Sequence, residues 1–291
     1  MSEPAERRFS LGDRNLAALH WPSFAPRPLR LLALHGWLDN AASLSRLAVE
    51  LPGCEILALD LAGHGRSDWR GSDASYALVE HLPDVLAVLD QLSWPQSVVL
   101  GHSMGGAIAS LLAVAAPERV GALICIDALG PLSLPESEAP ARLRRALKAR
   151  SEPSPRRRVF ADVAAAVEQR AQLSGLSIEA AQALVERALQ PVEGGHSWAA
   201  DPRLQLLSAA PMSEAQVQAI LRAISQPTLV LAADTPDPRL PRLQVAARLD
   251  CVPHAQCLQL PGGHHLHLAE PQCAGRAIRE FLAGLDDAGL G

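Results

Sequence analysis

The stretch Val98-Val99-Leu100-Gly101-His102-Ser103-Met104-Gly105-Gly106 decides the fold of this chain. An apolar, strand-like run leads into it, and an alanine- and leucine-rich helical run over residues 107–116 follows it. Between a strand and a helix, Gly-x-Ser-x-Gly forms a sharp turn whose glycines let the two main chains crowd together while the serine takes a strained conformation. We therefore expect Ser103 to present an exposed hydroxyl. The alternative is a glycine turn at a helix start in which Ser103 only caps the helix.

Strand and helix signals alternate along most of the chain, which predicts an α/β fold with a mostly parallel central sheet and helices on both faces. Residues 7–21 predict an N-terminal hairpin about Gly12-Asp13. Further strands are expected at 29–34, 54–59, 98–102, 122–126, 228–232 and 256–260, and helices at 41–51, 75–92, 107–116, 214–224, 240–249 and 272–285.

The alternation stops between residues 130 and 210, where prolines, arginines and helix-like stretches at 142–150 and 178–190 replace buried strands. We interpret residues 131–210 as a helical lid inserted after the strand that ends near Asp127. The core would then consist of residues 1–130 and 211–291. The basic stretch 142–158 is interpreted as a solvated face of the lid, and the alternative is that it attracts an anionic substrate or partner.

Composition limits the function classes. The chain has 291 residues, 48% of them hydrophobic, and a net charge of −5, which gives no reason to expect nucleic acid as a partner. The five cysteines have no metal-binding spacing and are expected to be reduced thiols. No apolar run reaches the roughly 18 residues of a membrane span, and the N-terminus has no signal core. We expect a cytoplasmic protein without cofactor or metal that acts on a small-molecule substrate away from membranes. Whether it forms a homo-oligomer is left open.

Four motifs together resemble the α/β-hydrolase fold, over nearly the whole chain outside the lid. They are His35-Gly36-Trp37, Asp60-Leu-Ala-Gly-His-Gly-Arg-Ser67-Asp68, the Ser103 turn, and Gly263-His264 followed by Glu270-Pro271. Within that superfamily, Leu34-His35-Gly36-Trp37-Leu38-Asp39-Asn40 and Pro261-Gly-Gly-His-His-Leu-His267 most resemble the serine hydrolase-like group.

The resemblance implies a base for Ser103, because a serine hydroxyl is a poor nucleophile until a base takes its proton. In this fold the base is a histidine on the loop after the last strand. His264, His265 and His267 all lie there. The family motif places a proline seven residues after the histidine, and Pro271 fits that register for His264. His265 is then expected to be a loop residue, and His267 a supporting contact.

The developing oxyanion of such a reaction needs preorganised donors. We expect one donor to be the backbone N–H of Met104, at a helix N-terminus where the helix dipole also favours an anion. The second is expected to be the backbone N–H of Trp37, where Gly36 lets the chain turn. His35 is expected to pin this loop and His102 to pack beneath the turn. His64 and Asp60 are expected to shape their own loop.

The acid that orients the histidine is less clearly marked. Most relatives carry it nine residues past the proline that begins the strand at 228–232, and here that position is Pro236. Some members of the fold use an acid at the end of the preceding strand instead, which here is Asp127. We favour Asp127, and Asp234 and Asp237 remain the alternatives.

The leading hypothesis is therefore a cofactor-independent serine hydrolase that cleaves a carboxylic ester or similar acyl bond through a Ser103 acyl-enzyme. The same residues could serve carbon–carbon bond hydrolysis or acyl transfer. A ligand-binding protein that keeps the fold without turnover is the alternative from another class, because fold alone does not fix function.

Overall fold

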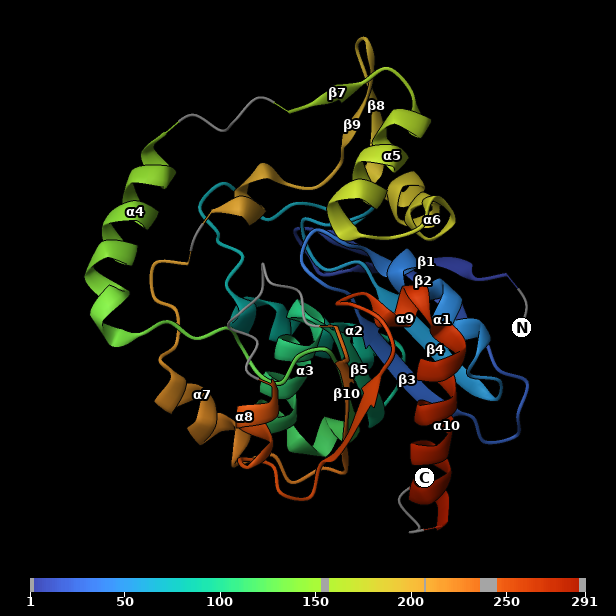
Figure 1. The fold of residues 1–291 in the computed structure, drawn as a ribbon. Helices are drawn as coiled ribbons and strands as arrows, with labels where there is room; N and C mark the ends of the chain where they lie inside the picture. Colours follow the sequence, from blue (N-terminus) through green and yellow to red (C-terminus); the bar gives the residue numbers. More distant parts are fainter. Residues whose placement is uncertain (1–2, 153–156, 207, 236–244, 288–291) are drawn as a thin grey trace.

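An eight-stranded sheet forms the centre of the molecule, with the strand order β1-β2-β4-β3-β5-β6-β10-β11 (Figure 1). The computed structural model describes residues 3–152, 157–206, 208–235 and 245–287. The strands are β1 (Ala5–Ser10), β2 (Asn15–Trp21), β3 (Leu29–Leu34), β4 (Cys54–Leu59), β5 (Ser97–His102), β6 (Val120–Ile126), β10 (Thr228–Ala233) and β11 (Gln256–Leu260).

Six of these strands run parallel, and only the first two break the pattern. β1 and β2 form an antiparallel hairpin, and β2 pairs antiparallel with β4. All pairs from β4 to β11 are parallel. Parallel strands all end at the same edge of the sheet, so the residues that follow β3, β5, β6, β10 and β11 are brought together there.

Helices cover both faces of the sheet, as the near-continuous apolar strands require. Alternate residues of β3 belong to opposite cores, because successive side chains of a strand point to opposite faces. Leu32 and Leu34 pack with α2 (His81–Gln91) and α3 (Met104–Ala115). Leu31 and Ala33 pack on the other face with α1 (Ser45–Val49) and α10 (Pro271–Asp287). The predicted α/β fold with a mostly parallel sheet is confirmed.

Shorter helices complete the core. The expected helix at 41–51 is a 3-10 turn, η1 (Ala41–Leu44), followed by α1, and the one at 75–92 begins as η2 (Leu78–Glu80) before α2. α7 (Glu214–Leu221) precedes β10, α8 (Val245–Leu249) precedes β11, and α9 (Leu266–Ala269) precedes α10. The first part of the helix expected at 240–249 lies outside the described residues. Within the described part of the chain, no helix is long and apolar enough to cross a membrane.

Between β6 and α7 the chain leaves the sheet and builds a separate group of elements above its carboxyl edge and to one side (Figure 1). These elements are α4 (Ala139–Ser151), β7 (Val159–Phe160), α5 (Val163–Ser174), α6 (Ile178–Ala188), β8 (Leu189–Val192) and β9 (Gly195–Trp198). Besides its helices, the segment predicted as a helical lid contains a small antiparallel sheet of β7, β9 and β8. Gly194 and Gly195 both have positive φ, at 83° and 141°, and allow the β8–β9 turn.

Side chains from this segment are anchored in the core by buried polar contacts. Arg187 of α6 donates to both oxygens of Asp60 and to Glu6 of β1. Its side chain is 5% exposed and that of Asp60 is fully buried. A buried guanidinium needs such carboxylate partners to offset the loss of its hydration. α6 is therefore held firmly over the loops that follow β3 and β4.

Candidate active site

Ser103 lies between the last residue of β5 and the first residue of α3, with φ 51° and ψ −114°. A non-glycine residue in this region is strained, and it persists only where its surroundings enforce it. The neighbouring glycines allow the helix and the strands to pack so closely that Ser103 is held in this conformation. A Cβ on Gly101 would lie 2.2 Å from the Gly105 carbonyl oxygen, and one on Gly105 would lie 2.2 Å from that of Leu34. Only glycine permits this approach of helix and strand, which holds the Ser103 side chain at the edge of the sheet.

His264 contacts Ser103 through one ring nitrogen and Asp127 through the other. Its Nε2 lies 2.9 Å from Ser103 Oγ, and its Nδ1 lies 2.6 Å from Asp127 Oδ2. A carboxylate can only accept, so Nδ1 carries the proton and Nε2 presents its lone pair to the serine hydroxyl. The three residues are 161 and 137 positions apart in the chain, and the parallel sheet brings them together. The contacts therefore run in one line from the Asp127 carboxylate through the His264 ring to the Ser103 hydroxyl.

Asp127 follows β6 and has φ 46°, a left-handed conformation uncommon for a residue other than glycine. Its Oδ1 accepts from the backbone N–H of Ala233 at 3.1 Å, which leaves Oδ2 to His264. Its own N–H donates to the Leu231 carbonyl at 2.7 Å. The end of β10 therefore fixes the carboxylate in place.

Asp234 and Asp237 were the alternatives to Asp127 as the partner of His264. Asp234 Oδ1 accepts from the backbone N–H of Gly262 at 3.0 Å and from the Thr235 hydroxyl at 3.0 Å. Its side chain is exposed, and it braces the loop after β11 rather than contacting a histidine. Asp237 lies outside the described residues.

The other histidines near Ser103 have separate partners. His265 Nε2 lies 3.5 Å from Asp39 Oδ2. His267 Nε2 lies 2.9 Å from the Ser43 hydroxyl, and burial lowers the pKa of His267 to about 3, so its ring is neutral. His102 is buried beneath the turn and donates from Nε2 to the backbone carbonyl of His264 at 2.9 Å. Among the described histidines, His264 is the one whose ring is hydrogen-bonded to the Ser103 hydroxyl.

The two backbone N–H groups expected to bind an oxyanion belong to Met104, the residue after Ser103, and to Trp37, on the loop after β3. Neither the N–H of Met104 nor that of Trp37 has a hydrogen-bond acceptor among the described residues. Met104 is the first residue of α3, where an N–H has no partner within the helix and the dipole favours negative charge. The Trp37 side chain is about half exposed and donates from Nε1 to the Leu204 carbonyl at 3.0 Å, so it links its loop to the segment before α7.

The Asp60–Ser67 loop and His35 hold the loop that follows β3. Asp60 accepts the backbone N–H groups of Ala41 at 2.7 Å and Arg66 at 2.8 Å. His35 donates from Nδ1 to the Gly36 carbonyl at 2.7 Å and accepts from Leu61 N–H at 3.0 Å. Burial lowers the pKa of His35 to about 4, so the ring stays neutral and can do both. These contacts fix the loop that carries Trp37.

Two residues close to the site were not singled out from the sequence. Asp39 is buried beside His102 and His265, and Arg170 of α5 contacts its Oδ1. Asp39 lies two residues after Trp37 within the quoted motif, so the sequence contained a signal for it. Arg170 lies in a segment without recognisable motifs, and only the packing of α5 over the core places it here.

Comparisons with known proteins agree with this geometry. A family model described as alpha/beta hydrolase fold matches residues 30–271. Serine hydrolase-like protein 2 from Homo sapiens is 30% identical, and the match covers 96% of this chain and 94% of that protein. The crystal structure of a hypothetical protein from Pseudomonas aeruginosa PAO1 is 40% identical with a TM-score of 0.86, covering 98% of this chain and all of that one. A thioesterase domain from the curacin biosynthetic pathway is 26% identical with a TM-score of 0.85, covering 96% of this chain and all of that domain. The chain belongs to the α/β-hydrolase fold family and, within it, to the serine hydrolase-like group.

Proposed function

We propose that this protein is a serine hydrolase that cleaves a carboxylic ester or a similar acyl bond of a small molecule through a Ser103 acyl-enzyme. The family and the names of the relatives support a hydrolase. The observation that carries the finer proposal is the directional chain Asp127–His264–Ser103, with contacts of 2.6 and 2.9 Å. The proposed reaction needs no cofactor.

In the proposed reaction, Ser103 Oγ attacks the acyl carbon and its proton passes to His264 Nε2. Asp127 stabilises the imidazolium that forms and keeps the ring in the orientation that faces the serine. The N–H groups of Trp37 and Met104 hold the oxyanion, and loss of one such donor typically costs about 3 kcal/mol of transition-state stabilisation. His264 then gives the proton to the leaving group, and water releases the acyl group by the same steps.

A thioester is the second substrate class that we propose. The similarity to a thioesterase domain over 96% of this chain favours it, and the same proton transfers serve a thiolate leaving group. Carbon–carbon bond hydrolysis and acyl transfer use the same residues and would be distinguished by product analysis with added alcohols. A ligand-binding role would appear as tight binding of a small molecule without turnover.

We further propose that residues 131–210 act as a cap over the site on a core of residues 1–130 and 211–291. The contact between Trp37 Nε1 and the Leu204 carbonyl supports this role, because it joins the proposed oxyanion loop directly to the inserted segment. Part of the basic stretch at 142–158 lies outside the described residues.

Replacing Ser103 by Ala tests the proposal. We expect the variant to lose turnover of short p-nitrophenyl esters and thioesters by several powers of ten, because loss of a nucleophilic serine typically costs about 10⁶-fold in kcat. Labelling by a fluorophosphonate should disappear as well, while the far-ultraviolet circular dichroism stays unchanged. Wild-type protein that neither turns over a broad ester and thioester panel nor reacts with the probe would refute the proposal.

A further inference from the structure

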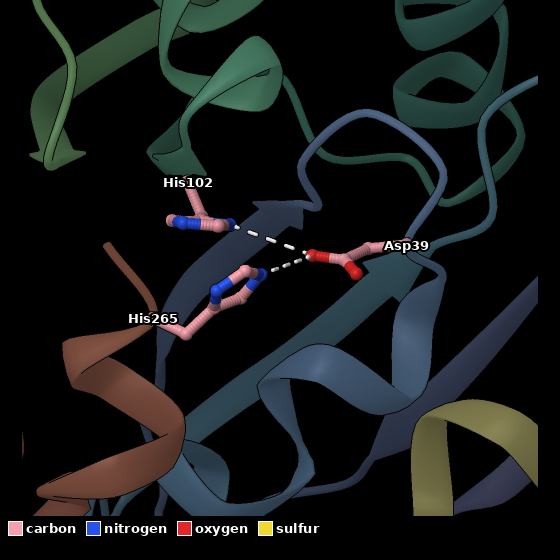
Figure 2. Close-up of side chains that lie close together, drawn as sticks. All are labelled: Asp39, His102 and His265. Carbon is pink, nitrogen blue, oxygen red and sulfur yellow. Dashed lines mark ion pairs between the residues drawn. The ribbon is translucent and has the colours of Figure 1, made fainter. Parts of the chain in front are cut away.

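Asp39, His102 and His265 form a cluster behind the Ser103–His264 pair. Figure 2 shows their side chains converging from three segments that are distant in sequence, namely the loop after β3, the end of β5 and the residue before α9. Each residue offers one ligand atom, and the three atoms lie within 4.8 Å of one another. Asp39 and His102 are buried, and the His265 side chain is 14% exposed.

His102 carries an unpartnered lone pair that faces Asp39. Its Nε2 donates to the His264 carbonyl, so Nε2 holds the proton of the ring. Burial keeps the pKa of His102 well below its ordinary value, so the ring is neutral and Nδ1 has a free lone pair. Nδ1 is buried, has no hydrogen-bond partner among the described residues, and lies 3.7 Å from Asp39 Oδ2. A buried lone pair and a carboxylate oxygen that face each other lack a donor between them, and a shared cation would satisfy both.

The Asp39 carboxylate is ionised, and its two oxygens have different neighbours. Burial alone would raise its pKa, but the charge of Arg170 and the hydrogen bond from His265 hold the pKa of Asp39 well below its ordinary value. Arg170 contacts Oδ1. Oδ2 faces both histidines, at 3.7 Å from His102 Nδ1 and 3.5 Å from His265 Nε2.

We propose that Asp39 Oδ2, His102 Nδ1 and His265 Nε2 bind one divalent transition-metal ion of the Zn²⁺ class, with the proton of the His265 ring carried on Nδ1 once Nε2 binds the ion. Zn²⁺ bonds of about 2.0–2.1 Å in a tetrahedron place neighbouring ligand atoms about 3.3 Å apart. The two contacts with Oδ2 exceed that spacing by only a few tenths of an ångström. Rotation of the partly exposed His265 ring would bring its Nε2, which lies within 4.8 Å of His102 Nδ1, to the same spacing. Two imidazoles with one carboxylate favour a transition metal over Mg²⁺ or Ca²⁺.

The outer contacts of this cluster are those that metal ligands ordinarily have. His102 donates its other ring nitrogen to a backbone carbonyl, which fixes the tautomer that leaves Nδ1 as a ligand. The second oxygen of Asp39 is held by Arg170. The sequence predicts no metal, because these residues are spread along most of the chain and form no spacing motif. The proposal departs from that prediction.

A bound ion would connect the Trp37 loop, the end of β5 and the loop that carries His264. Because His102 donates to the His264 carbonyl, fixing His102 also fixes the backbone of the proposed base. We therefore expect Zn²⁺ to raise the thermal unfolding midpoint, since an ion that binds only the folded state stabilises it.

The test uses the full-length protein after treatment with a chelator, titrated with Zn²⁺ by calorimetry and with Co²⁺ by visible absorption. We expect one ion per chain and Co²⁺ bands typical of a tetrahedral site. His265→Ala should weaken Zn²⁺ binding at least about tenfold, since loss of an outer partner alone costs 10–100-fold. It should also remove the rise in thermal midpoint. Asp39→Asn should weaken binding in the same direction.

Two matched variants separate this cluster from other histidines. His264→Ala removes the ring of the proposed base and keeps the carbonyl that His102 contacts, and His254→Ala removes a histidine distant from the cluster. Both should bind Zn²⁺ as the wild type does. Absence of Zn²⁺ binding in the wild type, unchanged binding in His265→Ala, or loss of binding in His264→Ala would each overturn the proposal. Binding lost in His264→Ala would place the ion on the Ser103–His264 pair instead.

Discussion

Each carboxylate oxygen of Asp127 has its own hydrogen-bond partner, and a substitution of this one residue can therefore test its proposed role. Oδ1 is held by the Ala233 N–H and Oδ2 by His264 Nδ1. A carboxylate so fixed accepts the Nδ1 proton and leaves the lone pair of Nε2 for Ser103. An amide of the same shape could instead donate to Nδ1, which would shift the ring proton to Nε2 and away from its useful position.

We predict that Asp127→Asn lowers kcat on an ester substrate by about four powers of ten, the loss typical of amidating the acid of such a triad. Steady-state kinetics measure it, with urea unfolding to show that the fold is kept. Asp234→Asn is the matched control and should lower kcat by less than about tenfold, because Asp234 braces a loop. A large loss confined to Asp234→Asn would reverse the assignment, and equal losses in both would mean that the two carboxylates share the role.

Part of this site follows from the sequence and part does not. The Gly-x-Ser-x-Gly turn and the proline register at Pro271 predict the serine and the histidine. The sequence favours Asp127 as the acid but leaves Asp234 and Asp237 as alternatives, because two different strands end near the same edge. The hydrogen bond from Ala233 to Asp127 depends on the pairing of β10 with β6, which no local pattern contains.

At the scale of elements, the crossing of α3 over the sheet depends on glycines that admit no side chain. We predict that Gly105→Ala lowers the free energy of unfolding by at least about 2 kcal/mol, because its Cβ would lie 2.2 Å from the Leu34 carbonyl oxygen. Urea unfolding measures this. Gly284→Ala in α10 is the control, since its Cβ meets nothing within 4 Å and alanine in a helix gains up to about 1 kcal/mol. Equal effects of the two changes would contradict the packing described here.

The contact between α6 and the core gives a second experiment at this scale. Arg187→Ala should lower the free energy of unfolding by about 3 kcal/mol, because it leaves the buried Asp60 carboxylate without its charge partner. Arg66→Ala removes a half-exposed arginine 3.5 Å from Glu6 and should change stability by less than about 1 kcal/mol. Thermal and urea unfolding compare the two variants. A cost of Arg187→Ala no larger than that of Arg66→Ala would show that the buried pair does not hold α6.

The elements of the core were more predictable than those of the inserted segment. The strands at 29–34, 54–59 and 256–260 have the expected bounds. The hairpin of β8 and β9 was missed. Its strands are short and only partly buried, so they lack the apolar pattern of a core strand, and its Gly194-Gly195 turn was the only local signal.

At the scale of the whole molecule, buried neutral histidines make stability depend on pH. Burial lowers the pKa of His35 to about 4 and those of His64 and His267 to about 3, from an ordinary 6.5. Between pH 6.5 and about pH 4 the unfolded chain therefore binds protons that the folded chain does not. The stability is fully present above pH 6.5 and falls with pH through this window, by up to about 1.4 kcal/mol per pH unit for each histidine.

Urea unfolding at a series of pH values measures this slope. His267→Gln is the matched variant, since it removes one of the three groups and should reduce the slope by about one proton, whatever its effect on stability at neutral pH. A free energy of unfolding that stays constant from pH 7 to pH 4 would show that these rings can take up protons in the folded state.

The distance along the chain between Ser103 and His264 has a consequence for how the protein is made. The serine and its neighbouring acid emerge from the ribosome long before the histidine, which is 161 residues behind the serine. The segments of the Ser103 turn and of the parallel strands are therefore synthesised before the proposed base. In the proposed mechanism, reactive chemistry is thus withheld until the loop after β11 has been made, by which point the segments of all the parallel strands already exist.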